Sequence, residues 1–101
     1  MHANISVAVV SLSLQSWDPP ALSKPGAVAM TAVAVGACVV GDLASASLST
    51  MGFQPLVLTA HVSANGTVAV ILRHVGDGSS DGGGAIEVAE GMLRVLVTRL
   101  E

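Results

Sequence analysis

Three histidines are the residues best suited to acid–base chemistry, and no motif places any of them beside a nucleophile. His2, His61 and His74 are scattered along a chain of 101 residues. Hydrolytic or transfer chemistry needs a nucleophile, a base and an orienting group held together. No signature for that arrangement occurs, and His61 and His74 are expected at the surface or at an interface. The sequence therefore predicts a protein that is not an enzyme and has no cofactor.

A second chemical possibility is a calcium loop near the glycine-rich segment 76–84. Asp77, Ser79 and Asp81 supply alternating oxygen atoms before Gly82, as in the first half of a calcium-binding loop. The carboxylate that such a loop requires at its twelfth position is replaced by Val88. The favoured interpretation is a surface loop without a metal, with an ion site as the alternative.

Charge and cysteine content exclude several other classes of function. The net charge is −3, and the four basic residues are spread along the chain, so no patch is predicted for nucleic acid. They are Lys24, Arg73, Arg94 and Arg99. Cys38 is the only cysteine, which leaves no partner for an intrachain disulfide. It is expected to be a small buried hydrophobic residue.

No membrane span is predicted from the hydrophobic pattern. The longest apolar stretch, 27–40, is interrupted by Thr31 and Gly36, and it is shorter than the roughly 20 residues that a membrane helix needs. The N-terminal stretch 1–14 lacks the basic start of a signal peptide and is interrupted by Asn4 and serines. Export by that route is not expected.

The elements that carry these residues are predicted to be β-strands. Short runs rich in β-branched residues alternate with clusters of Gly, Pro, Asn and Asp, which is typical of a sandwich or barrel. Asp18-Pro19-Pro20 should end the first strand, because proline cannot donate to a ladder. The fold class predicted is all-β, a small antiparallel β-sandwich of about six to eight strands. The strands are expected at 5–14, 27–35, 43–47, 56–64, 67–75 and 92–99.

The Asn65-Gly66 pair predicts a hairpin whose register can be argued from the two faces. A two-residue turn would mix polar and apolar residues on both faces. A type I turn with Gly66 as a left-handed bulge instead pairs Ser63 with Thr67 and gives a wholly apolar core face. The cross-strand pairs then expected on that face are Val62 with Val68, Ala60 with Val70 and Leu58 with Leu72.

Composition predicts that the domain has a stable partner. Hydrophobic residues make up 51% of the chain, charged residues 11%, and the mean hydropathy is +0.72. A small domain cannot bury all of that surface by itself. We therefore expect a homo-oligomer or incorporation into a larger assembly, with no catalytic site.

Residues 1–14 are predicted to form an N-terminal strand or arm, followed by a sandwich domain over 15–101. Ile5, Val7 and Val9 should share one face of that strand, and Ala8, Val10, Leu12 and Leu14 the other. An apolar strand of this kind can add to the sheet edge of a neighbour. Trp17 is expected to pin the crossover onto the sandwich, with a contact to a partner as the alternative. Further contact residues are expected on an outer face that carries Thr59, His61, Ile71 and Arg73.

The pattern over about 14–97 resembles a family of small β-sandwich virion structural proteins of tailed bacteriophages, the capsid decoration or cement proteins. The residues that carry the resemblance are Leu14, Trp17-Asp18-Pro19, Gly26-Ala27, Thr31, Val33, Val35-Gly36-Ala37, Gly41-Asp42, Leu56, Leu58, Val62-Ser63-Ala64, Thr67-Val68, Val70, Leu72 and Leu93-Arg94-Val95. The glycine-rich segment after His74, Ala46 and Ser47, and the long first strand depart from the pattern.

The resemblance implies a structural protein that stabilises the phage head by binding the major capsid protein. Its location would be the capsid surface of the virion, after synthesis in the host cytoplasm. The alternative is a fibre or tail-associated module that recognises host glycan. Such sites stack sugars on aromatic rings, and Trp17 and Phe53 are the only aromatic residues here.

Overall fold

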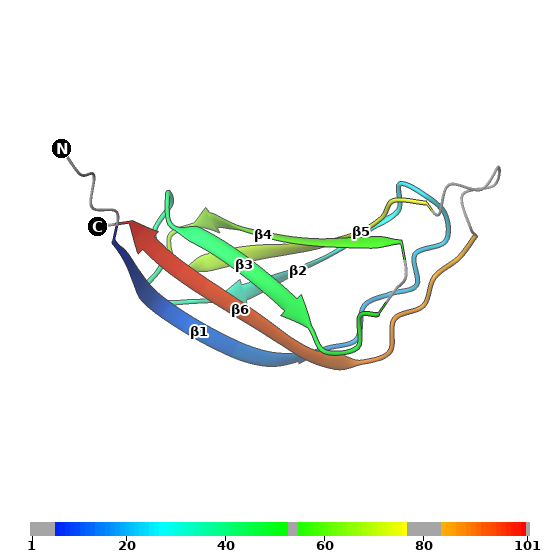
Figure 1. The fold of residues 1–101 in the computed structure, drawn as a ribbon, viewed down its shortest axis with the longest axis horizontal. Coiled ribbons are helices and arrows are strands. Elements are labelled where there is room, and N and C mark those ends of the chain that lie inside the picture. The colour runs from blue at the N-terminus through cyan, green and yellow to red at the C-terminus, as the bar shows by residue number, and fades with distance from the viewer. Residues whose placement is uncertain (1–5, 53–54, 77–83, 101) are drawn as a thin grey trace.

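The computed structural model describes residues 6–52, 55–76 and 84–100, and within these ranges the chain is all-β without a helix. Six strands form two antiparallel sheets of three strands each, which confirms the predicted fold class (Figure 1). The strands are β1 (Val7–Trp17), β2 (Val28–Ala34), β3 (Leu43–Leu48), β4 (Leu56–Ala64), β5 (Thr67–His74) and β6 (Gly91–Leu100).

Sheet A has the order β1-β6-β3 and sheet B the order β2-β5-β4. The two sheets come together along one side, where β3 lies against β4. On the other side β1 and β2 are the outer strands of their sheets. The short connections, 35–42 and the Asn65-Gly66 turn, lie at the same end of the sandwich as the start of β1 and the end of β6 (Figure 1).

The core is built from aliphatic side chains on the two central strands. Alternate residues of a strand face the same side of its sheet, and the inward set of β5 and β6 is fully buried. These residues are Val68, Val70, Leu72, Leu93, Val95 and Val97. Cys38 is also buried, as predicted, at 1% exposure. Small and medium side chains therefore fill the space that aromatic residues fill in many sandwiches.

The β4–β5 hairpin has the predicted core pairs. Val62 lies opposite Val68, and the two pairs further along the hairpin also match the prediction. Gly66 has a φ of +83°, and no described residue other than glycine has a positive φ, which excludes a type I′ turn. The closing pair differs from the prediction, because Thr67 lies opposite Ala64 and Ser63 is the extra residue.

The opposite end of the sandwich is closed by its long connections. Leu22 and Ile86 exchange two backbone hydrogen bonds of 2.8 Å and form an isolated bridge. Leu22 and Val88 are buried, so this bridge covers the end of the core. β1 ends immediately before Asp18-Pro19-Pro20, as predicted, although it begins at Val7 and extends to Trp17.

Gly91, the first residue of β6, permits a close approach of the turn after β3. A β-carbon at Gly91 would lie 2.5 Å from Thr50 Oγ1, 2.8 Å from Thr50 Cγ2 and 2.9 Å from Ser49 Oγ. These side chains are held in place, because Thr50 Oγ1 donates to the Ala89 carbonyl at 2.7 Å and Ser49 Oγ accepts from the Met92 amide at 2.8 Å. A side chain at position 91 would displace them.

Replacing Gly91 with alanine should therefore lower the free energy of unfolding by about 1–3 kcal/mol, the usual cost of overpacking. Chemical denaturation monitored by far-UV circular dichroism would measure it. Gly36→Ala is the matched control, since no atom lies within 4 Å of the added β-carbon and Gly36 has no positive φ. Equal losses in the two variants would show that the contact between the turn and β6 is not tight.

Candidate interaction surface

A one-residue bulge in β1 decides which of its side chains reach the core. Val9 lies opposite Thr98 and Ser11 lies opposite Val97, so Val10 is an extra residue in the ladder with β6. Val10 and Ser11 are both half-buried, and strict alternation resumes on either side of them. Beyond the bulge, every side chain of β1 lies on the face opposite to the one that unbroken alternation predicts.

The predicted division of the β1 faces is therefore wrong beyond Val10. Leu12 and Leu14 were expected to share a face with Ala8 and Val10, but both point away from the core and are exposed. The physical reason is the bulge, since Leu12 lies opposite Leu96, an outward residue of β6, and not opposite the buried Val95. Ser11, Ser13 and Gln15 take the half-buried inner positions instead.

The outer face of sheet A, which we call the sheet A face, is consequently rich in apolar side chains, although Ser16, Ser45, Ser47 and Thr98 also lie on it. Seven of its large apolar side chains each leave between 42% and 67% of their surface exposed, although they lie on a regular sheet. They are Val7, Val9, Leu12, Leu14, Leu43, Met92 and Leu100, with the half-buried Leu96 among them. The pairing of the three strands places Arg94 as the one charged residue on this face of the described chain. Exposed apolar surface of this extent is typical of an interaction site.

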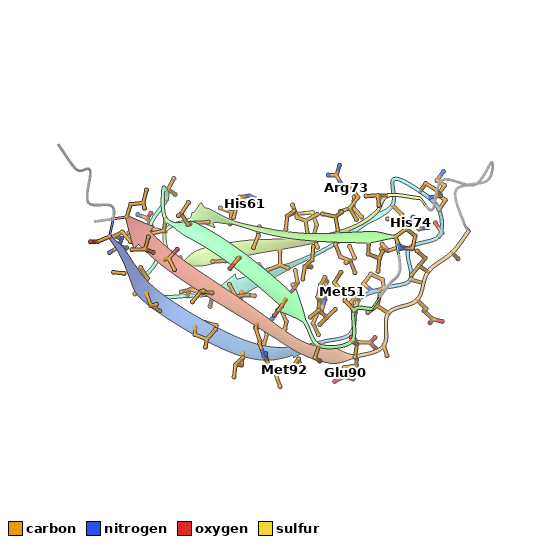
Figure 2. The ribbon with its side chains drawn as sticks, viewed as in Figure 1. Met51, His61, Arg73, His74, Glu90 and Met92 are labelled. Atoms are coloured by element: carbon orange, nitrogen blue, oxygen red, sulfur yellow. The ribbon has the colours of Figure 1, made fainter. Side chains whose placement is uncertain are left out.

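The outer face of sheet B carries the second predicted contact region. Thr59, His61 and Arg73 are exposed and Ile71 is half-buried, with Thr59 opposite Ile71. Figure 2 shows His61 and Arg73 projecting from the outside of sheet B, whereas Met92 projects from the outside of sheet A. Their predicted placement on the outer face is confirmed. This face also exposes Val28, Met30 and Val57. It has fewer large exposed apolar side chains than the sheet A face, and it includes a histidine and an arginine.

The remaining predicted contact residues are Ile5, Val7, Val9 and Trp17, and those that the structure describes lie in two different environments. Ile5 lies outside the described residues. Val7 and Val9 belong to the sheet A face. Trp17 is half-buried, packs against the core and lies opposite Gly91, so its ring fastens the end of β1 onto the sandwich.

His74 is buried completely, which corrects its predicted place at the surface. Its Nε2 lies 2.6 Å from the Gly84 carbonyl, and its Nδ1 accepts from the Gly76 amide at 3.0 Å. These contacts require the proton on Nε2. The ring therefore joins the two ends of the glycine-rich segment, and both nitrogens are occupied by backbone partners. The burial could have been predicted, because His74 follows Leu72 on the inward face of β5.

An ion pair fastens the 35–42 connection to the end of β6. Arg99 donates to both carboxylate oxygens of Asp42, at 2.7 and 2.8 Å, and Val39 adds a backbone donor at 3.0 Å. The hydrogen bond from Arg99, followed by that from Val39, lowers the pKa of Asp42 from its ordinary value of 3.8 to about 2. The Asp42 side chain is 3% exposed and that of Arg99 44%, so water partly screens the pair. Asp42 in turn raises the pKa of Arg99.

The described residues also bear on the metal site considered from the sequence and on the chemistry of one shallow hollow. They contain no group of three or more His, Cys, Asp or Glu side chains placed to hold a metal ion. The calcium loop considered from the sequence falls largely within 77–83, outside the described residues. A shallow hollow of about 380 Å³ is lined by Asp18, Glu87, Val88 and Ala89. Its carboxylates have neither a nucleophile nor a histidine among these lining residues.

Comparison with known proteins adds no relative. No protein-family model, curated protein or solved structure matches the chain. Within the described ranges there is also no helix of the length and apolarity needed to cross a membrane. The sheet A face is therefore the feature on which a function can be argued.

The Asp42–Arg99 pair predicts a specific dependence of stability on pH. Because the pKa of Asp42 is lowered in the folded protein, its contribution to stability is present above about pH 4 and is lost as the pH falls toward 2. The difference in unfolding free energy between the wild type and Asp42→Asn should therefore shrink across that window. Denaturant titrations between pH 2 and 6 would measure it, and Arg99→Gln should show the same trend. A difference that stays constant from pH 4 to 2 would contradict the pairing.

Proposed function

We propose that the chain is a structural virion protein of a tailed bacteriophage, a decoration or cement protein that binds the major capsid protein through the sheet A face. The observation that carries this proposal is the exposed apolar surface described above, with Arg94 as its one charge in the described strands. Exposed apolar surface of this kind marks a site where a partner protein is expected to bind.

The chemistry of the face suits a permanent assembly better than a transient complex. Obligate interfaces resemble a domain core cut in half, whereas transient ones are about as polar as the rest of the surface. Val9, Leu12 and Leu14 have the side-chain types of a core but lie outside it. A capsid shell repeats the same contact many times by symmetry, so a small rigid sandwich without a catalytic site can stabilise it.

A glycan-recognising fibre module receives less support from the described residues. Sugar-binding sites commonly present an exposed aromatic ring, and Trp17 is half-buried against the core. Phe53, the other aromatic residue, lies outside the described ranges. The sheet A face has no aromatic ring among its described residues, and its aliphatic side chains can pack against another protein. Its polar side chains are Ser16, Ser45, Ser47, Thr98 and Arg94.

The proposal can be tested with two variants, each of which adds one negative charge to the outer face of one sheet. Leu14→Glu buries a charge if the sheet A face meets the shell, so it should weaken binding to shells of the major capsid protein by about tenfold or more. Cosedimentation of purified protein with shells that lack it would measure the loss. Thr59→Glu, on the outer face of sheet B, is the matched control and should bind as the wild type does. Both side chains are exposed, so neither change should alter the far-UV β signal.

Two outcomes would contradict this assignment. If Thr59→Glu weakens binding and Leu14→Glu does not, the contact is made by the outer face of sheet B. If the wild type does not bind shells at all, the capsid role is wrong. Counting copies in purified particles would then identify a fibre or tail module, which should be present in tens of copies, whereas a decoration protein should reach the order of hundreds.

A further inference from the structure

The outer edge of β1 is a long strand edge without the usual protection against pairing. β1 is one of the two edge strands of sheet A and spans 11 residues. Natural proteins shield such edges with lysine, proline, short strands or bulges. β1 has neither proline nor any charged residue, and the bulge at Val10 is its one device of this kind. An edge so composed is suited to accept another strand.

The exposure pattern of β1 is symmetric about its bulge. From Val7 to Leu14 the side chains are exposed, half-buried, exposed, half-buried, half-buried, exposed, half-buried and exposed. This order of exposed and half-buried residues is the same when read from Val7 to Leu14 or from Leu14 to Val7. Its centre lies between Val10 and Ser11. A strand without the bulge would alternate regularly and would have no such unique centre.

This symmetry makes β1 complementary to a second copy of itself. In an antiparallel pair, residues directly opposite each other point to the same side of the sheet. Only a register centred between Val10 and Ser11 satisfies that rule along the whole of Val7 to Leu14. It places Val9 opposite Leu12 of the second copy, and Val7 opposite Leu14. A register displaced by two residues in either direction would set outward side chains against inward ones beside the bulge.

We propose that two copies of the chain pair β1 with β1 in this register, about a two-fold axis at the bulge. The two sheets A then form one continuous sheet of six strands, order β3-β6-β1-β1-β6-β3. The apolar rows of the two copies become continuous, because Leu96 and Leu12 of one copy align with Val9 of the other. The inference is independent of the capsid proposal, although such a dimer would present a face of twice the area to any shell.

Electrostatics permits this arrangement. Two described charges lie on β6 opposite β1: Arg94 is opposite Leu14, and Arg99, which is ion-paired with Asp42, is opposite Ala8. The two-fold axis places the two copies of Leu14 at opposite ends of the paired strands, roughly 23 Å apart for seven residues at 3.3 Å each. Charges at that separation are beyond the screening length of about 8 Å in physiological salt. Like charges therefore do not oppose the pairing.

Paired cysteines test both the contact and its register. In a Cys38→Ala background, Val9→Cys with Leu12→Cys should give a covalent dimer on mild oxidation, since the two positions face each other across the axis. Within one chain they are about 10 Å apart, too far for an intrachain disulfide. Val7→Cys with Leu12→Cys, which are not opposed in this register, is the matched control and should remain mostly uncrosslinked on denaturing gels.

Charge variants test the same contact without a covalent bond. Leu12→Lys should weaken the dimer by about tenfold or more, measured by analytical ultracentrifugation, because it adds a charge at the edge. Adding Val9→Glu to it should restore the dimer through two cross-strand ion pairs. Met92→Lys places the same charge on the same face but on β6, away from the edge, and should leave the dimer intact.

The proposal is overturned by any of three results. Equal crosslinking in the two cysteine pairs would exclude the register. If the wild type is a monomer at micromolar concentration and neither cysteine pair gives a covalent dimer, the bulge protects the β1 edge from pairing. Open-ended polymers in place of dimers would indicate pairing of β1 with the β2 edge of another copy. Absence of shell binding by the wild-type chain, when the cysteine pairs still crosslink as predicted, would count against the capsid proposal alone.

Discussion

The extra residue at Val10 in the ladder between β1 and β6 determines the character of the whole molecular surface. A strand has two faces, and one residue of displacement exchanges them. With the bulge, Leu12 and Leu14 join Val7 and Val9 on the outside, while Ser11, Ser13 and Gln15 take half-buried places inside. Without it, the same leucines would lie opposite buried positions of β6. The places of Leu12 and Leu14 on the sheet A face, and the symmetric exposure pattern of the β1 edge, follow from this local feature.

The inner face of β1 can be partly polar because the buried aliphatic side chains of the two central strands, β5 and β6, fill the core. Val68, Val70 and Leu72 of β5 are completely buried, as are their counterparts on β6. The ends are closed by specific contacts: the Leu22–Ile86 bridge and His74 at one end, and Asp42 with Arg99 at the other. A sandwich fastened in this way can leave leucine and valine side chains of an edge strand outside its core.

The fold class and most strand positions could be predicted because their signals are local. Prolines mark the end of β1, and the Asn65-Gly66 pair together with the alternation of apolar residues defines the hairpin. The bulge could not be predicted, since no glycine or proline marks Val10 and its cause lies in the pairing with a strand far along the chain. The constraint at Gly91 is equally non-local, because it comes from Thr50 in another connection. The burial of His74 follows from the alternation of inward and outward residues along β5. The prediction placed it at the surface because histidine is polar.

The register of β1 against β6 in solution is the most direct test of this account. Cross-strand nuclear Overhauser effects in the isotopically labelled chain would report which backbone protons face each other. The account predicts contacts that place Ser11 opposite Val97 and Leu12 opposite Leu96, with the Leu12 and Leu14 methyl groups accessible to a soluble paramagnetic probe or shielded only by a second copy. Contacts that place Leu12 opposite Val95, with both leucines protected in a monomer, would show that the bulge is absent and would contradict the account.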